Sequence, residues 1–321
     1  RDSDRFVYNS GSSMGGEFVL VAGVDGIRQA VSDGTEVIFG NTSLVNVGFS
    51  PDTYDVTLDM SSLPEGWDAH FLYDGVEYTS TQIALEPYDN ANLTVVIANG
   101  DNGSGRVRLD IFSQAQGEVV ESFDFMAHAG GTDFIVVADE SGEAAAVYDE
   151  AVAATGKSHI TWDNSLSSVS SDILLAYDAV IWETGSNGTC LNDADRTALN
   201  TFLAAEGRLF LAGEDVLQSL YDQSGSARLW YQLKLRINYS SGNSGNLNVN
   251  GVDGDPIGDG LAFTLTGGDP DQLLLIPGQP VEVSFEFGNG EPAGVRTTYS
   301  NYMVVTLSLI HISEPTRQLM S

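Results

Sequence analysis

Over the first part of the chain, apolar and polar residues alternate with the two-residue period of a half-buried β-strand. The alternation is clearest in three segments, 53–58, 93–97 and 106–111. Runs rich in Pro, Gly, Asn and Asp lie between such segments, as expected of turns. Short strands at this spacing predict an all-β sandwich over residues 31–128. Residues 1–30 are harder to place, and we interpret them as the tail of an upstream segment.

The pattern changes after a short linker of small residues at 129–131. Residues 133–138 form a continuous apolar run, typical of a strand buried on both faces of a parallel sheet. Further strands are predicted at 159–162, 178–182, 208–212 and 302–305, and helices at 144–154, 192–207 and 217–230. This alternation predicts a doubly wound α/β domain over residues 132–306. The Gly- and Asp-rich region 235–300 is interpreted as a β-rich insertion.

The net charge of −32 excludes two classes of partner. Lys157 and Lys234 are the only lysines. A surface this acidic repels the phosphates of nucleic acids and anionic membranes. No apolar run approaches the roughly 20 residues of a membrane-spanning helix, so we expect no nucleic acid partner and no membrane insertion. Hydrophobic residues make up 42% of the chain, which is enough for packed cores.

The two ends of the sequence are interpreted separately from the domains. The chain begins with Arg1 and shows no signal peptide. The segment from Leu307 to Arg317 resembles the in-frame translation of a transposase sequencing adapter. We therefore treat residues 307–321 as an adapter artefact, and we expect a truncated domain whose natural sequence continues beyond Thr306.

Residues of about 35–128 resemble the immunoglobulin-like domains appended to bacterial extracellular hydrolases. The resemblance is carried by three runs, Ser50-Pro51-Asp52-Thr53-Tyr54-Asp55-Val56, Leu63-Pro64-Glu65-Gly66-Trp67 and Asn92-Leu93-Thr94-Val95. It implies an immunoglobulin-like β-sandwich in which the second run turns into the next strand and buries Trp67.

The rest of the chain is similar to class I glutamine-amidotransferase-like domains of flavodoxin fold in large secreted bacterial proteins, some beside immune-inhibitor-A-like metallopeptidases. Three runs carry this resemblance, Tyr177 to Trp182, Gly207 to Asp215 and Gly254 to Leu261. It implies a flavodoxin-like accessory domain in an extracellular or cell-surface protein. Its partners would be other domains of the same parent chain, and an extracellular glycan or protein.

The residues that amidotransferase chemistry requires are not where the pattern puts them. A cysteine nucleophile belongs at a sharp strand-to-helix turn, and that turn here is Gly213-Glu214-Asp215. The sole cysteine, Cys190, follows the preceding strand and is interpreted as a half-buried loop residue. His70, His128 and His159 are scattered singly, and neither a Gly-x-Ser-x-Gly elbow nor a His-Glu-x-x-His helix is present. We therefore predict no catalytic residues.

Acidic residues follow several strands of the predicted parallel sheet. They are Asp139 and Glu140 after the first strand, Glu183 after the third, and Glu214 and Asp215 after the fourth. Since sites in open parallel sheets form beyond the carboxyl ends of the strands, these five carboxylates are expected at one edge. Such a cluster suits Ca²⁺ or Mg²⁺. The alternative is that these acids cap helix N-termini and face water.

The preferred function is a non-catalytic accessory, spacer or interaction region of a larger secreted bacterial protein, such as a peptidase or other hydrolase. The alternative is a module that binds carbohydrate or a divalent metal through the carboxylate edge. Among the aromatic residues, Trp67, Trp162 and Trp182 lie within or beside strand patterns and are assigned to the cores, whereas Trp230 and Tyr231 are the candidates for an exposed pair.

Overall fold

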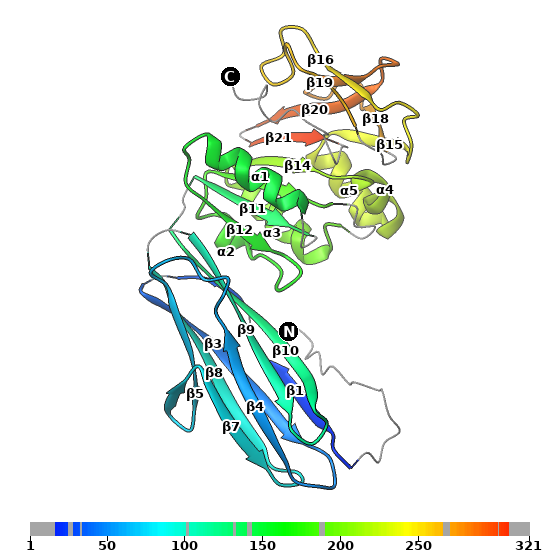
Figure 1. Ribbon diagram of the computed structural model, residues 1–321. Coiled ribbons are helices and arrows are strands. Elements are labelled where there is room, and N and C mark those ends of the chain that lie inside the picture. The colour runs from blue at the N-terminus through cyan, green and yellow to red at the C-terminus, as the bar shows by residue number, and fades with distance from the viewer. Residues whose placement is uncertain are drawn as a thin grey trace. The chain divides into compact units, whose positions relative to one another are not determined.

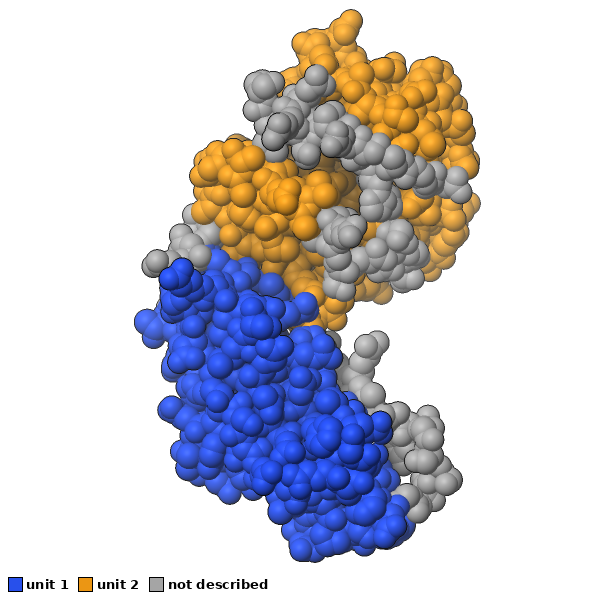
Figure 2. All heavy atoms as spheres, viewed as in Figure 1, with its two compact units in different colours: residues 1–130 blue, residues 131–321 orange. Residues whose placement is uncertain are grey.

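The computed structural model describes residues 17–24, 28–32, 34–100, 103–130, 133–139, 143–185, 190–265, 270–300 and 302–307. The chain divides into two compact units, unit 1 (residues 1–130) and unit 2 (residues 131–321), coloured separately in Figure 2. The boundary falls within the predicted linker, although Ala129 still belongs to the last strand of unit 1. Each unit is built around its own hydrophobic core, as expected of a domain.

Unit 1 consists of two five-stranded sheets (Figure 1). The first has the order β1 (Leu20–Val24), β3 (Glu36–Asn46), β8 (Asn90–Ala98), β5 (Asp68–Tyr73), β6 (Val76–Tyr78). The second has the order β2 (Gln29–Val31), β10 (Glu118–Ala129), β9 (Gly103–Ser113), β4 (Asp52–Asp59), β7 (Ser80–Leu85). All neighbouring strands are antiparallel except β2 and β10.

The interpretation of residues 1–30 as an upstream tail needs correction. β1 pairs with β3 along its whole length, and β2 adds to the edge of β10. β1 and the first two residues of β2 lie within that segment, so it contributes to one edge strand of each sheet of unit 1. They are short, with five and three residues, and a short edge strand carries too little alternation to be recognised by period alone. Residues 1–16 lie outside the described residues.

Alternating side chains fill the core of unit 1. On β4, Tyr54 and Val56 are fully buried, whereas Asp55 is partly exposed and Thr57 is exposed, as the two-residue period predicts. Phe39 and Phe125 come from different sheets, and their ring centroids lie 5.3 Å apart. Trp67 is 9% exposed, which confirms its assignment to the core. A methyl group on Gly105 would lie 2.7 Å from the Trp67 ring, so the indole packs directly on that backbone.

Unit 2 is organised around one nine-stranded mixed sheet (Figure 1). Its parallel half has the order β12 (His159–Asp163), β11 (Phe134–Ala138), β13 (Ala179–Glu183), β14 (Arg208–Ala212), β21 (Tyr302–Leu307). Antiparallel strands β20 (Pro292–Tyr299), β19 (Val281–Phe287), β16 (Asn248–Gly251) and β17 (Ala262–Thr264) extend it. β15 (Ile237–Ser241) and β18 (Gln272–Leu275) form a separate two-stranded antiparallel sheet. The β-rich region after residue 235 therefore mostly continues the main sheet.

Five helices lie between the parallel strands in the described part of unit 2. They are α1 (Glu143–Ala154), α2 (Ser171–Leu174), α3 (Asp193–Ala204), α4 (Val216–Gln223) and α5 (Gly225–Lys234). Numbered along the chain, the parallel strands have the order 2-1-3-4-5, in which the connections change direction between β11 and β13. Such a reversal is where ligands bind in open α/β sheets.

Side chains of the sheet pack against these helices. Trp182 packs in the core that includes α3, and Tyr148 of α1 contacts Phe210 of β14, with ring centroids 5.9 Å apart.

Two local predictions in unit 2 differ from the structure. The single helix predicted over residues 217–230 is two helices, because Ser224 adopts an extended conformation and its hydroxyl accepts the N–H of Ala227 as the cap of α5. Helix α2 was not predicted, since four residues are too few for a helical period. Of residues 307–321, the structure describes only Leu307, which completes β21 and pairs with Ala212 and Gly294.

Candidate functional site at the carboxyl edge of the parallel sheet

Asp139 lies directly after β11, beside the point where the strand order reverses. One of its carboxylate oxygens accepts the side-chain N–H of Asn164 at 2.7 Å. The other accepts the indole N–H of Trp182 at 3.1 Å and the backbone N–H of Leu191 at 3.4 Å. The carboxylate therefore joins three segments of unit 2, which is a structural use of the acid.

Asp195 forms a pair with Asp139 that the sequence analysis missed. It lies in the first turn of α3, is 1% exposed, and accepts the backbone N–H of Asn192 at 2.9 Å. The Asn164 amide reaches both acids, at 2.7 Å from Asp139 and 3.2 Å from Asp195. Burial, followed by the negative charge of Asp139, raises the pKa of Asp195 to about 6. Only the folding of the loop around Asn164 brings these acids together, so strand and helix patterns could not reveal the pair.

Glu183 lies on the opposite face of the sheet from Asp139. In the register of β11 and β13, Val137 is paired with Trp182 and Ala138 with Glu183, and paired residues point to the same side of the sheet. Since successive side chains alternate between faces, Trp182 and Asp139 share one face and Glu183 points to the other. There it is fully buried. Burial, with the charge of Glu183 as a second cause, raises the pKa of the Tyr148 hydroxyl on α1.

Glu214 and Asp215 form the turn between β14 and α4. Asp215 has a left-handed backbone with φ of 56°, and its side chain does not cap the helix. Asp271 performs that function instead, because its carboxylate accepts the N–H of Leu217 at 2.8 Å and that of Gln218 at 3.4 Å. A buried acid is favoured at this position by the positive end of the helix dipole.

The described acids do not form the cluster that the sequence analysis expects. Glu140 lies outside the described residues. Within the part of the chain that the structure describes, no three Asp, Glu, His or Cys side chains are grouped so that they could hold a metal ion. The alternation of faces separates Glu183 from Asp139, and the latter is engaged by protein donors. Metal binding at this edge stays a prediction.

Cys190 is fully buried, not half-buried as predicted. Its backbone N–H donates to the Ser219 hydroxyl at 3.1 Å, and its thiol donates to the Val216 carbonyl at 3.8 Å. Burial raises the pKa of the thiol to about 12. Since the thiolate is the nucleophilic form, Cys190 is a packing residue at neutral pH.

The three histidines of the described chain lie in separate places. His159 contacts the Asp149 carboxylate at 2.8 Å, and His70 lies 3.9 Å from Glu77. His128 is fully buried in unit 1, where its Nδ1 lies 2.7 Å from the Ser104 hydroxyl. Burial lowers the pKa of His128 to about 3. None of these contacts joins a histidine to Cys190.

The three tryptophans of unit 2 are buried. Trp162 and Trp182 are 1% and 0% exposed, which confirms their assignment to the core. The prediction of an exposed pair at Trp230 and Tyr231 is wrong, because these residues are 6% and 2% exposed. The indole N–H of Trp230 donates to Asn200 at 3.0 Å, which satisfies its polar atom while the ring packs between α5 and α3.

No protein-family model and no curated protein matches the chain. Similar solved structures include the N-terminal domain of mmIFT52, at 12% identity and a TM-score of 0.42, over 56% of this chain and 87% of that one. A glutamine amidotransferase from Thermotoga maritima is 11% identical with a TM-score of 0.37, over 56% and 76%. The CARDB domain of the PF1109 protein from Pyrococcus furiosus, in complex with di-metal ions, is 14% identical with a TM-score of 0.25, over 38% and 98%.

All three TM-scores are below 0.5. Its own strands define a β-rich chain of two units with several sheets. In the part of the chain that the structure describes, every helix is too short or too polar to span a lipid bilayer.

Proposed function

We propose that this chain is a non-catalytic interaction region of a larger secreted bacterial protein. In this proposal, unit 1 is an immunoglobulin-like sandwich, and unit 2 is a flavodoxin-like domain of the glutamine-amidotransferase-like type that has no nucleophile. The strand order 2-1-3-4-5 of the parallel half supports the assignment of unit 2.

The turn between β14 and α4 carries the proposal. A nucleophile for acyl transfer stands on a sharp strand-to-helix turn of this kind, where the adjacent amides and the helix dipole activate it. The residue with the left-handed backbone there is Asp215, which offers neither a thiol nor a hydroxyl. The thiol of Cys190, the one cysteine of the chain, is sealed in the core with a pKa of about 12.

Two acids near that edge, Asp139 and Asp271, have structural roles, which also supports the proposal. Asp139 ties together Asn164, Trp182 and Leu191. Asp271 caps α4. A carboxylate that holds several protein N–H donors is a poor general base, because most of its lone pairs are already occupied.

Activity assays on the full chain test the proposal. Ammonia release from glutamine, hydrolysis of p-nitrophenyl acetate and cleavage of labelled casein should each proceed at the rate of buffer alone. Asp215→Asn is the matched variant, since it removes the charge at the turn and keeps the shape of the side chain. Turnover above buffer that Asp215→Asn abolishes would instead make the chain a carboxylate-dependent hydrolase.

A further inference from the structure

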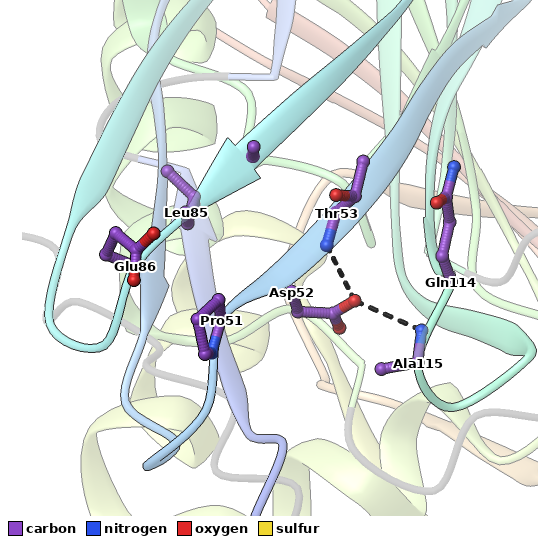
Figure 3. Close-up of a pocket in the computed structure, with 8 residues that line it drawn as sticks. Pro51, Asp52, Thr53, Leu85, Glu86, Gln114 and Ala115 are labelled. Carbon is purple, nitrogen blue, oxygen red and sulfur yellow. Dashed lines mark hydrogen bonds between the residues drawn. The ribbon is translucent and has the colours of Figure 1, made fainter.

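A pocket of about 380 Å³ lies at one end of unit 1 (Figure 3). Its wall includes residues at the start of β4, at the end of β7 and in the turn between β9 and β10, namely Pro51, Asp52, Leu85, Glu86, Gln114 and Ala115. This turn is at the opposite end of β10 from Ala129, where the chain leaves the unit. Loops at the end of a β-sandwich are common positions for binding residues on a rigid scaffold.

The floor of this pocket is preorganised by Asp52, which is 6% exposed. Its carboxylate accepts the N–H groups of Thr53 at 2.7 Å and Ala115 at 3.1 Å (Figure 3), and the hydroxyl of Ser113 at 2.5 Å. These bonds join β4 to the β9–β10 turn. The pocket is therefore held open by the fold before any ligand binds, which lowers the entropic cost of binding.

Two exposed aromatic side chains belong to the loops that run from this wall. Phe49, two residues before Pro51, is 64% exposed, and Tyr88, two residues after Glu86, is 67% exposed. They are the two most exposed large hydrophobic side chains in the described part of the chain. Each lies between strands, so its exposure does not result from the alternation of side chains along a strand.

Asn46 fixes the two loops against each other. Its side chain is fully buried and donates to the carbonyls of Ser50 and Leu85, both at 3.0 Å. Its backbone carbonyl accepts the N–H of Tyr88 at 2.6 Å. One buried residue thus sets the positions of both aromatic loops, which makes them a rigid pair of supports and not two independent loose turns.

Tyr88 is held in a strained conformation. Its φ is 70°, in the left-handed region that bulky residues rarely adopt. Burial of the ring does not compensate for this strain, because most of the side chain is exposed. Strain of this kind is concentrated at binding and catalytic sites, where it presents a side chain to a ligand.

The charges around the pocket restrict the ligand. The wall carries the acids Asp52 and Glu86, and none of the residues that line it is basic. Anionic ligands are therefore repelled. The exposed rings offer apolar faces, while Glu86 and the Gln114 amide offer hydrogen-bond acceptors for hydroxyl groups. A sugar ring presents both an apolar C–H face and a rim of hydroxyls.

We propose that this end of unit 1 binds a neutral polysaccharide, with Phe49 and Tyr88 packing on sugar rings and the pocket accepting a sugar unit between Glu86 and Gln114. The inference rests on the proposed function, because it names the ligand class of the interaction region. It places recognition in unit 1 and not at the carboxylate edge of unit 2.

Native affinity electrophoresis of the full chain tests this inference. The gels contain barley β-glucan, arabinoxylan, galactomannan or galactan, with polygalacturonate as the anionic comparison. At least one neutral polysaccharide should retard the chain, and polygalacturonate should not. Phe49→Ala and Tyr88→Gly should each weaken that binding by about ten-fold or more. Glycine at position 88 accepts the left-handed backbone, so this variant removes the ring without adding strain.

Ile38→Ala is the matched control for loss of an exposed apolar side chain. Ile38 is 62% exposed on β3, and it lies eight residues before Asn46, roughly 25 Å along the strand. It should bind like the wild type, and melting curves should show that all three variants fold.

Two results would overturn the inference. One is the absence of retardation by all four neutral polysaccharides, and the other is retardation of the Phe49 and Tyr88 variants equal to that of the wild type. Turnover in the activity assays would overturn the proposed function alone, so the two failures are distinguishable.

Discussion

The tryptophans of unit 2 and the two most exposed aromatic side chains in the described part of unit 1 are used in opposite ways. In unit 2, Trp162, Trp182 and Trp230 are buried and pack between the sheet and its helices. In unit 1, Phe49 and Tyr88 stand on turns at one end of the sandwich, each more than 60% exposed. The difference shows where a ring can contact a ligand with little loss of core packing. A turn can present a ring to solvent without opening a core, whereas an inward-facing ring on a strand or helix is needed for packing.

Buried ionisable groups also separate the units. His128 in unit 1 is held neutral, with a pKa lowered to about 3 by burial. Asp195 in unit 2 is buried beside Asp139, and its pKa is raised to about 6. Acid therefore acts on the two units in opposite directions, because protonation charges the first group and neutralises the second.

Truncation of a core ring should have the largest effect. Trp182→Ala should lower the free energy of unfolding of unit 2 by about 3–5 kcal/mol, since it leaves a cavity and removes a donor to Asp139. Phe49→Ala should change the stability of unit 1 by no more than about 0.5 kcal/mol, because its ring is mostly in solvent. Calorimetry of the full chain would measure both. Similar losses in the two variants would remove the contrast between the units.

The buried acid pair gives the next largest effect. The folded pKa of Asp195, about 6, exceeds its usual value of 3.8, so its contribution to stability is fully present below about pH 4 and is lost as the pH rises through 6. The loss amounts to about 3 kcal/mol. Asp195→Asn should abolish this part of the pH dependence of the unit 2 transition. Denaturant unfolding at pH 4.5 and pH 7.5 would test it, and parallel curves for the two proteins would contradict the pairing.

Burial of His128 should make the stability of unit 1 depend on pH in the opposite direction. Its folded pKa of about 3 lies below its usual value of 6.5, so the stabilising contribution is present above pH 6.5 and is lost as the pH falls towards 3. At pH 4.5 the loss is about 2–3 kcal/mol. His128→Gln does not titrate and retains an acceptor for Ser104. The variant should therefore lose less stability than the wild type between pH 7 and pH 4.5, as measured on the unit 1 transition. An equal loss would show that His128 does not cause the difference.

Calcium should have the smallest effect. With a net charge of −32, any added salt screens self-repulsion and raises stability. CaCl₂ and NaCl at equal ionic strength should therefore raise the melting temperature of the full chain to a similar extent. A saturable shift specific to calcium, lost in Glu183→Gln or Asp139→Asn, would restore the metal site at the carboxylate edge.

Regular elements with a clear period were predictable from the sequence. The segment 208–212 coincides with β14, and Asn192 caps α3 through its side chain as expected. In both cases the signal is local, because side-chain alternation or a capping residue acts within a few positions. The prediction of a single helix at 217–230 was wrong because Ser224 fits a helical pattern and also caps a new helix.

The candidate site was less predictable than the fold. That Asp139 follows a strand is visible in the sequence, but its partners Asn164 and Leu191 come from loops, and Asp195 comes from the first turn of α3. The expected grouping with Glu183 ignored the alternation of faces along β13. For Phe49 and Tyr88, a signal did exist, since each aromatic residue interrupts a run of turn-forming residues. An aromatic residue in such a run has no strand or helix face into which it could be buried.

One comparison tests the central claim, that recognition belongs to unit 1 and not to the carboxylate edge of unit 2. Phe49→Ala and Asp215→Asn are run beside the wild type in the same neutral-polysaccharide gel. Phe49→Ala should lose retardation, whereas Asp215→Asn should be retarded like the wild type. Loss of retardation in Asp215→Asn, with binding retained in Phe49→Ala, would instead assign the ligand to unit 2.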